Sequence, residues 1–190
     1  MILGVDTIPS SVMDALIIAT DGFEDSELYY PYYRLQENGW AVQVATPGGY
    51  EIEGKHGYEF DGDLDLEDRD PERFADTFDL VVIPGGSSPE TLRTEAPVAA
   101  AIVAAFDEVG VPIASICHGA QLLISADVLE GREIAAYWSL EVDVENAGAT
   151  FVDDEAVVDE NLITSRVPGD LPAFMNAVFE WLEQEESVAA

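Results

Sequence analysis

The sequence has little cysteine, little positive charge and no long apolar run. Its single cysteine, Cys117, excludes an internal disulfide framework and any metal site built only from cysteines. Only seven of the 190 residues are Lys or Arg, so neither nucleic acid nor a membrane surface is an expected partner. No apolar run approaches the roughly 20 residues that span a bilayer, and the N-terminus lacks the basic and apolar segments of a secretory signal. We therefore expect a soluble, cytoplasmic protein.

Acidic residues, in contrast, are abundant. The chain has 39 Asp and Glu, a formal net charge of −32 and a pI near 4.1, and Lys55 is its one lysine. So many carboxylates repel one another at low salt, whereas at about 1 M salt the screening length falls to roughly 3 Å. This composition favours a cytosolic protein of a salt-accumulating, halophilic organism over an ordinary acidic protein.

Short apolar runs alternate with amphipathic segments, and 48% of the residues are hydrophobic. This pattern predicts an α/β fold with a mostly parallel sheet covered by helices on both faces. The length and the lack of repeats or linkers predict one domain over residues 1–190. Expected strands are 15–19, 41–45, 80–83, 112–116, 133–137, a short one near 151 and others within 156–164, while 50–60 is expected to be an excursion or a hairpin. Expected helices are 26–37, 96–109, 121–129, 140–147 and 171–184.

Three candidate groups follow predicted strands directly. Glu24 comes after the first strand, Gly85 and Gly86 come after the 80–83 strand, and Cys117 comes after the 112–116 strand. Ligands of open α/β sheets bind beyond the carboxyl ends of the strands. These groups form one site only if the three strands are neighbours.

Cys117 lies where a buried strand gives way to a helix, which is the geometry of a nucleophile elbow. A helix N-terminus lowers a thiol's pKa and so favours the reactive thiolate. The alternative is an inert, buried cysteine. The backbone N–H groups of His118 and Gly86 are candidate oxyanion donors. His118 is a candidate base only if the elbow turns its side chain toward the thiol, because neighbouring side chains on extended backbone point to opposite sides.

Glu24 is the carboxylate that we expect beside the thiol. Two anions in contact are costly, so such a pair should share one proton and titrate as a unit. The alternative for any glutamate of this acidic chain is a solvated surface charge.

Several segments together resemble the ThiJ/PfpI family, in particular its protease-I-like branch. The resemblance runs from Ala15 to about Leu182, and its most distinctive segment is the Cys-His-Gly at 117–119 with the flanking 111–116 and 121–125. The other matching segments are 23–28, 54–58, 82–86 with Pro89-Glu90, 145–149, and 161–166 with 170–172. Two positions depart from the family pattern, since Ala120 and Trp138 stand where proline is usual. Residues 1–11 form an N-terminal extension without a family counterpart.

The resemblance implies the flavodoxin-like, three-layer sandwich of the class I glutamine amidotransferase-like proteins. It assigns Cys117 as nucleophile, Glu24 as its carboxylate partner and His118 as base, with Gly86 and His118 as backbone oxyanion donors. It further places Gly85, Tyr137 and Trp138 at the substrate pocket and brings Glu90 into the site from an adjoining subunit. A homo-oligomer, dimer or hexamer, is implied, with no cofactor and no metal.

The function that this resemblance favours is a stress-protection enzyme acting on small dicarbonyls, either a glutathione-independent glyoxalase or a deglycase of glycated proteins and peptides. A thiolate beside an acid/base suits such an electrophile, because a hemithioacetal forms and a proton then moves between adjacent carbons. Two alternatives stay open: an intracellular cysteine peptidase, and a non-enzymatic redox sensor or chaperone that depends on Cys117 oxidation.

Overall fold

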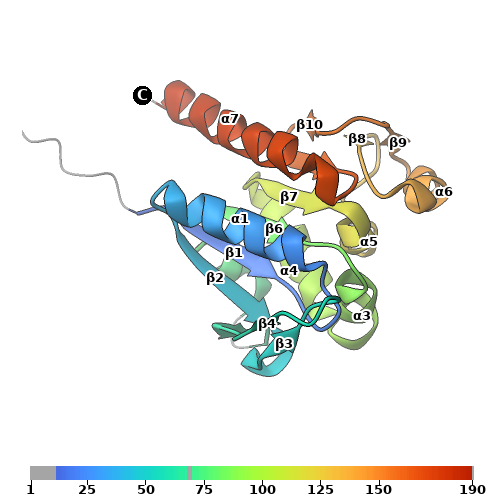
Figure 1. The fold of residues 1–190 in the computed structure, drawn as a ribbon. Helices are drawn as coiled ribbons and strands as arrows, with labels where there is room; N and C mark the ends of the chain where they lie inside the picture. Colours follow the sequence, from blue (N-terminus) through green and yellow to red (C-terminus); the bar gives the residue numbers. More distant parts are fainter. Residues whose placement is uncertain (1–11, 68–69, 190) are drawn as a thin grey trace, which may run out of the picture.

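A seven-stranded sheet forms the centre of the molecule (Figure 1). The structure, a computed structural model, describes residues 12–67 and 70–189, so the predicted extension 1–11 lies outside the described residues. The strand order is β10-β11-β7-β6-β1-β2-β5, and every neighbouring pair is parallel except β10 with β11. The strands are β1 (Asp14–Ile18), β2 (Ala41–Thr46), β5 (Leu64–Asp65), β6 (Leu80–Ile83), β7 (Ile113–Ile116), β10 (Val157–Asp159) and β11 (Leu162–Ser165).

Helices cover both faces of this sheet. Helices α1 (Asp25–Glu37) and α7 (Leu171–Ala189) lie side by side on one face (Figure 1). On the other face lie α2 (Pro71–Ala75), α4 (Val98–Val109) and α5 (Ala120–Ser125), with α3 (Ser88–Glu95) against α4 and α5. The short helix α6 (Glu141–Asn146) packs against α5. Single 3₁₀ turns are η1 (Pro47–Gly49), η2 (Cys117–Gly119), η3 (Trp138–Leu140) and η4 (Pro168–Asp170).

Alternation along the buried strands divides the core into two layers. In β1, Ala15 and Ile17 pack toward α1 and α7, whereas Leu16 and Ile18 pack toward α2, α4 and α5. Successive strand residues point to opposite faces of a sheet, and a strand covered on both faces is apolar throughout. This is why short continuous runs such as 80–83 correctly predicted interior strands.

The predicted elements differ from the structure mainly in the bounds of three elements and in several short elements that were not predicted. The expected strand 133–137 shortens to β8 (Glu133–Ile134), which pairs with β9 (Thr150–Phe151) in a separate two-stranded sheet. The expected helix 121–129 ends at Ser125, and the helix expected from 96 begins after Pro97. The hairpin is confirmed as β3 (Ile52–Glu53) and β4 (Glu59–Phe60). Sequence periodicity missed β5, α2 and α3, because each is short and buries few apolar side chains.

Strands β1, β6 and β7 are neighbours, with β6 in the middle. The condition set by the sequence is therefore met, since the segments that follow these strands emerge along one edge of the sheet. Chain order also reverses here, because β1 pairs with β2 on one side and with β6 on the other. Such a switch point is where doubly wound folds bind ligands. Within the described part of the chain, no helix is long and apolar enough to cross a membrane.

Candidate active site

Cys117 occupies a sharp turn between β7 and α5. Its φ of 61° is one of three positive values at non-glycine residues in the described chain. L-residues adopt such a conformation only where the surroundings hold it, and it recurs at functional sites. Glycine is required at position 119, because a Cβ there would lie 2.5 Å from Ser115 Oγ and 2.7 Å from the Ile83 carbonyl oxygen. The turn thus has the form of the predicted nucleophile elbow.

The carboxylate beside the thiol is Glu27, and the expectation that Glu24 would hold this place was wrong. Glu27 is fully buried, and its Oε2 accepts a hydrogen bond of 2.7 Å from the backbone N–H of Gly85. Its carboxyl group lies close enough to Cys117 for its charge to raise the pKa of the thiol. A Cβ on Gly85 would lie 2.6 Å from Glu27 Oε2 and 2.8 Å from Cys117 Cβ, so both side chains converge on this glycine.

Helix geometry explains why Glu27, and not Glu24, lies beside Cys117. Glu24 precedes α1 in extended conformation, and its carboxylate lies 3.6 Å from Lys55 Nζ and 3.3 Å from His56 Nε2. Glu27 lies in the first turn, on the buried stripe that continues through Leu28, Pro31 and Leu35. An acid at helical spacing from apolar positions was the signal in the sequence that could have identified it.

The pKa values of Glu27 and Cys117 both rise. Burial raises the pKa of Glu27 to about 7, with a further rise from the charge of Glu24 and an opposing effect of the Gly85 N–H. Burial, followed by the charge of Glu27, raises the pKa of Cys117 to about 12. One proton shared by the pair removes the repulsion between two anions, and because the pKa of Cys117 is the higher of the two, that proton lies on the sulfur.

Two backbone N–H groups lower the pKa of the Cys117 thiol. Hydrogen bonds from the N–H groups of His118 and Gly86 lower the pKa of the thiol and so oppose the effect of burial. Gly86 has a φ of 74° and forms a bridge with Phe23, and a Cβ there would collide with the carbonyl oxygen of Gly22. They are the two groups predicted from the sequence as oxyanion donors, and that role remains a prediction.

The elbow turns the His118 side chain toward the thiol. His118 Nδ1 lies 3.3 Å from Cys117 Sγ, and the imidazole stacks on the Tyr137 ring at 4.6 Å between centroids. Burial first, and then Lys55, lower the pKa of His118, while Glu90 opposes them. A neutral imidazole in contact with a thiol is suited to accept its proton.

The other predicted residues lie at the edge of the site. Tyr137 donates its backbone N–H to the Cys117 carbonyl oxygen at 3.1 Å, which fixes the stacked ring next to His118. The Trp138 ring is 5.5 Å from that of Tyr137 but is 69% exposed. Glu90 is exposed on α3 and acts on His118 through its charge. Its entry from a second subunit, and the oligomer itself, remain predictions.

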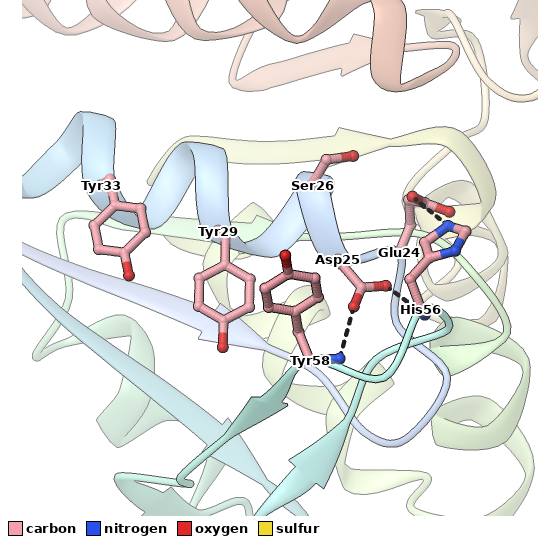
Figure 2. Close-up of a pocket in the computed structure, with 7 residues that line it drawn as sticks. All are labelled: Glu24, Asp25, Ser26, Tyr29, Tyr33, His56 and Tyr58. Carbon is pink, nitrogen blue, oxygen red and sulfur yellow. Dashed lines mark hydrogen bonds and ion pairs between the residues drawn. The ribbon is translucent and has the colours of Figure 1, made fainter.

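A pocket of about 580 Å³ adjoins Glu24, lined by Glu24, Asp25, Ser26, Tyr29, Tyr33, His56 and Tyr58 (Figure 2). Ligand atoms of Glu24, Asp25 and His56 lie within 4.8 Å of one another, as a metal site requires. The Asp25 oxygens, however, already accept hydrogen bonds from the backbone N–H groups of His56 and Tyr58, at 2.8 and 3.1 Å. Lys55 also places its positive charge beside Glu24. Both features disfavour a metal ion.

The fold defines a class: a flavodoxin-like, class I glutamine amidotransferase-like sandwich, here with Cys117 in the strained turn after β7. The DJ-1/PfpI family model matches residues 13–181, and the chain belongs to this family. The ThiJ/PfpI resemblance is therefore confirmed.

Named relatives agree with this assignment. A Thermococcus kodakarensis protein named "Deglycase TK1284" is 48% identical over 163 residues, covering 86% of this chain and 95% of its own. A Bacillus subtilis protein named "Putative cysteine protease YraA" is 41% identical over 159 residues, covering 83% and 91%. A crystal structure of a two-domain protein from Anabaena variabilis, with DJ-1/ThiJ/PfpI-like and ferritin-like domains, superposes with a TM-score of 0.84 at 34% identity. That match covers 90% of this chain and 48% of the larger protein.

Proposed function

We propose that this protein is a cysteine-dependent enzyme that acts on small dicarbonyls and their adducts, as a glutathione-independent glyoxalase or deglycase. The observation that carries the proposal is the contact of Cys117 with a buried carboxyl of raised pKa on one side and an imidazole of lowered pKa on the other. Such a site holds both a proton donor and a proton acceptor around one nucleophile near neutral pH. The deglycase name of a 48%-identical relative is consistent with it.

For methylglyoxal, His118 takes the thiol proton as the sulfur of Cys117 adds to the aldehyde carbon, and the new alkoxide takes the proton of Glu27 to give a hemithioacetal. The N–H groups of Gly86 and His118 stabilise the developing oxyanion. The Glu27 carboxylate removes the proton from the former aldehyde carbon and returns it to the neighbouring carbon, while the hydroxyl proton passes to the neighbouring oxygen, which gives a thioester. Water cleaves the thioester to the thiol and lactic acid, the acid returns a proton to Glu27 as lactate leaves, and His118 releases its proton to solvent. No oxidant or reductant is consumed, because the hydrogen moves within the substrate.

The test follows methylglyoxal loss and lactate formation in molar KCl without glutathione, in a buffer free of amines and thiols. We expect turnover by the wild type, none above background by Cys117→Ala, and a strong reduction by Glu27→Gln. Glu90→Gln tests the proposed acid from a second subunit, and sedimentation of the same samples gives the oligomeric state. Equal lactate from wild type and Cys117→Ala would contradict the proposal.

A cysteine peptidase is the second candidate, favoured by the name of the B. subtilis relative. His118 would then protonate the leaving amine after attack of Cys117 on the peptide carbonyl. Cleavage of unmodified peptides, lost in Cys117→Ala, together with no lactate formation would support this candidate over the glyoxalase. A sensor that depends only on Cys117 oxidation would show neither activity and would respond to peroxide titration.

A further inference from the structure

We infer that Thr164 is a positioning residue of the active site, because its hydroxyl group holds the segment 133–137 on β11 and thereby keeps the Tyr137 ring stacked on His118. Its effect on turnover rests on the proposed function, whereas the placement of the imidazole is measurable without any substrate. Thr164 acts through Tyr137 and is not itself a catalytic residue.

The segment 133–137 is tied to its neighbours along one edge. Three backbone N–H groups at alternate positions donate hydrogen bonds to β10, β11 and the elbow. The pairs are Glu133 with Asp159 Oδ2 at 2.7 Å, Ala135 with Thr164 Oγ1 at 2.9 Å, and Tyr137 with the Cys117 carbonyl oxygen at 3.1 Å. Alternate residues of an extended segment direct their N–H groups to the same side. Thr164 therefore supplies the middle of three bonds that align the segment with the main sheet.

The bond to Thr164 is made in the interior. Thr164 is fully buried and Ala135 is 1% exposed, so losing this partner would leave the Ala135 N–H buried and unpaired. Thr164 Oγ1 also donates to the carbonyl oxygen of Val157 at 3.3 Å. A hydroxyl group can accept and donate at once. Serine keeps both bonds, whereas valine has nearly the same shape as threonine and removes both.

Tyr137 depends on this anchoring because the next residue does not fix its backbone. Its φ and ψ are −58° and 131°, an extended conformation that a proline at position 138 would favour. Trp138 imposes no such restriction, and its ring is 69% exposed. The direction of the Tyr137 side chain therefore follows from the hydrogen bonds that hold the segment before it and the elbow beside it.

The stacked Tyr137 ring contributes to the environment of His118. The two rings lie 4.6 Å apart between centroids at an interplanar angle of 27°. Burial is the main cause that lowers the pKa of His118, followed by Lys55, and Glu90 opposes both. Lys55 and Glu90 lie on other elements, so a change at Thr164 leaves their charges in place. A loosened segment would uncover the imidazole and raise its pKa.

The experiment compares Thr164→Val, Thr164→Ser and Ser165→Ala. Ser165 is the matched control, because it is the next residue of β11, is equally buried, and donates its hydroxyl to the Glu155 carbonyl oxygen at 2.7 Å. The pKa of His118 is read from the NMR signals of its imidazole protons as a function of pH. The chain has two histidines, so His56→Gln assigns the signals.

We expect Thr164→Val to raise the pKa of His118 by about 0.5 pH unit. The imidazole protons should also move downfield, because the Tyr137 ring no longer shields them. The kcat/KM for methylglyoxal should fall about tenfold, since small displacements of catalytic groups are costly. Thr164→Ser and Ser165→Ala should keep the pKa within about 0.2 pH unit and kcat/KM within about threefold.

A double variant tests whether Thr164 acts through Tyr137. Tyr137→Leu removes the ring and should itself raise the pKa of His118. Thr164→Val combined with Tyr137→Leu should give the same pKa as Tyr137→Leu alone, because residues that act through one contact are not additive. If Thr164→Val does not fold, Thr164→Ala also removes the hydroxyl group and takes its place in every comparison.

Three outcomes would overturn the inference. The first is an unchanged His118 pKa and unchanged imidazole signals in the folded variant without the hydroxyl group. The second is an equal shift in Ser165→Ala, which would mean that any loss of a hydrogen bond on β11 has this effect. The third is an additive shift in the double variant. Absence of lactate formation by the wild type would contradict the proposed function alone, because the titration of His118 requires no turnover.

Discussion

Glu24 and Glu27 are three residues apart but occupy opposite kinds of environment. Glu27 lies in the dry interior against Cys117, where burial raises its pKa to about 7. Glu24 lies at the wall of the pocket that Tyr29, Tyr33 and Tyr58 also line, paired with Lys55 and His56. Both residues are glutamates, so residue type does not distinguish them. Burial and the nearest partner decide which carboxyl group lies where it could exchange a proton with the thiol.

The largest expected effect is a difference in catalytic activity between Glu27→Gln and Glu24→Gln. Glu27→Gln keeps the shape but removes the exchangeable proton, so kcat/KM for methylglyoxal should fall by about 10²–10³-fold. Glu24→Gln removes only a partly exposed ion pair and should stay within about fivefold of wild type. Lactate assays on both variants provide the measurement. A larger loss in Glu24→Gln than in Glu27→Gln would reverse the assignment made from the geometry.

Glu27→Gln should also make the protein more stable at neutral pH. The pKa of Glu27 rises from 4.5 to about 7 in the folded state, so the folded protein binds the extra proton between these values. Stability of the wild type therefore falls as pH rises through this window, and glutamine avoids that loss. The free energy of unfolding of the variant should exceed that of wild type by about 1–3 kcal/mol above pH 7 and match it near pH 4.

Urea denaturation at several pH values checks this expectation. Exposed Glu180 provides the control, since Glu180→Gln should change the free energy of unfolding by no more than about 0.5 kcal/mol. A difference between Glu27→Gln and wild type that does not vary with pH would mean that packing, and not ionisation, distinguishes the two side chains.

Gly85→Ala tests the convergence of Glu27 and Cys117 on one backbone position. The added methyl would lie within 2.9 Å of Glu27 Oε2, Cys117 Cβ and the His118 nitrogen, so it cannot be accommodated without displacing them. Overpacking of this kind should cost about 1–3 kcal/mol of stability and most of the activity. Gly169→Ala, with no atom within 4 Å of the new methyl, should be close to neutral in both thermal unfolding and lactate assays.

The smallest expected effect concerns Lys55, which pairs with Glu24 and also acts on the groups around Cys117. The positive charge of Lys55 lowers the pKa of both His118 and Glu27. Lys55→Met should therefore raise both, and the acid limb of the pH–rate profile should move to higher pH. Because Lys55 is largely exposed, the shift should shrink between 0.1 M and 2 M KCl. A shift to lower pH, or one that does not depend on salt, would show that Lys55 acts through structure and not through charge.

The sequence by itself determined the parallel α/β fold, the elbow at Cys117 and the glycine turn after β6. Apolar runs such as 80–83 identify strands covered on both faces, and strand-to-helix junctions identify the edge where ligands bind. The family followed from collinear motifs along most of the chain. These features are local, so the order of residues is sufficient to reveal them.

Only the tertiary structure decided that Glu27 meets the thiol, that His118 turns toward it and stacks on Tyr137, and that Tyr58 closes the pocket with Tyr29. Each depends on the rotation of a helix about its axis, the positive φ of Cys117 or the docking of the β3–β4 hairpin. The physical reason is that proton transfer and ring stacking require contacts of a few ångströms between segments distant in sequence. Packing of the whole sheet fixes those contacts, and no single motif does.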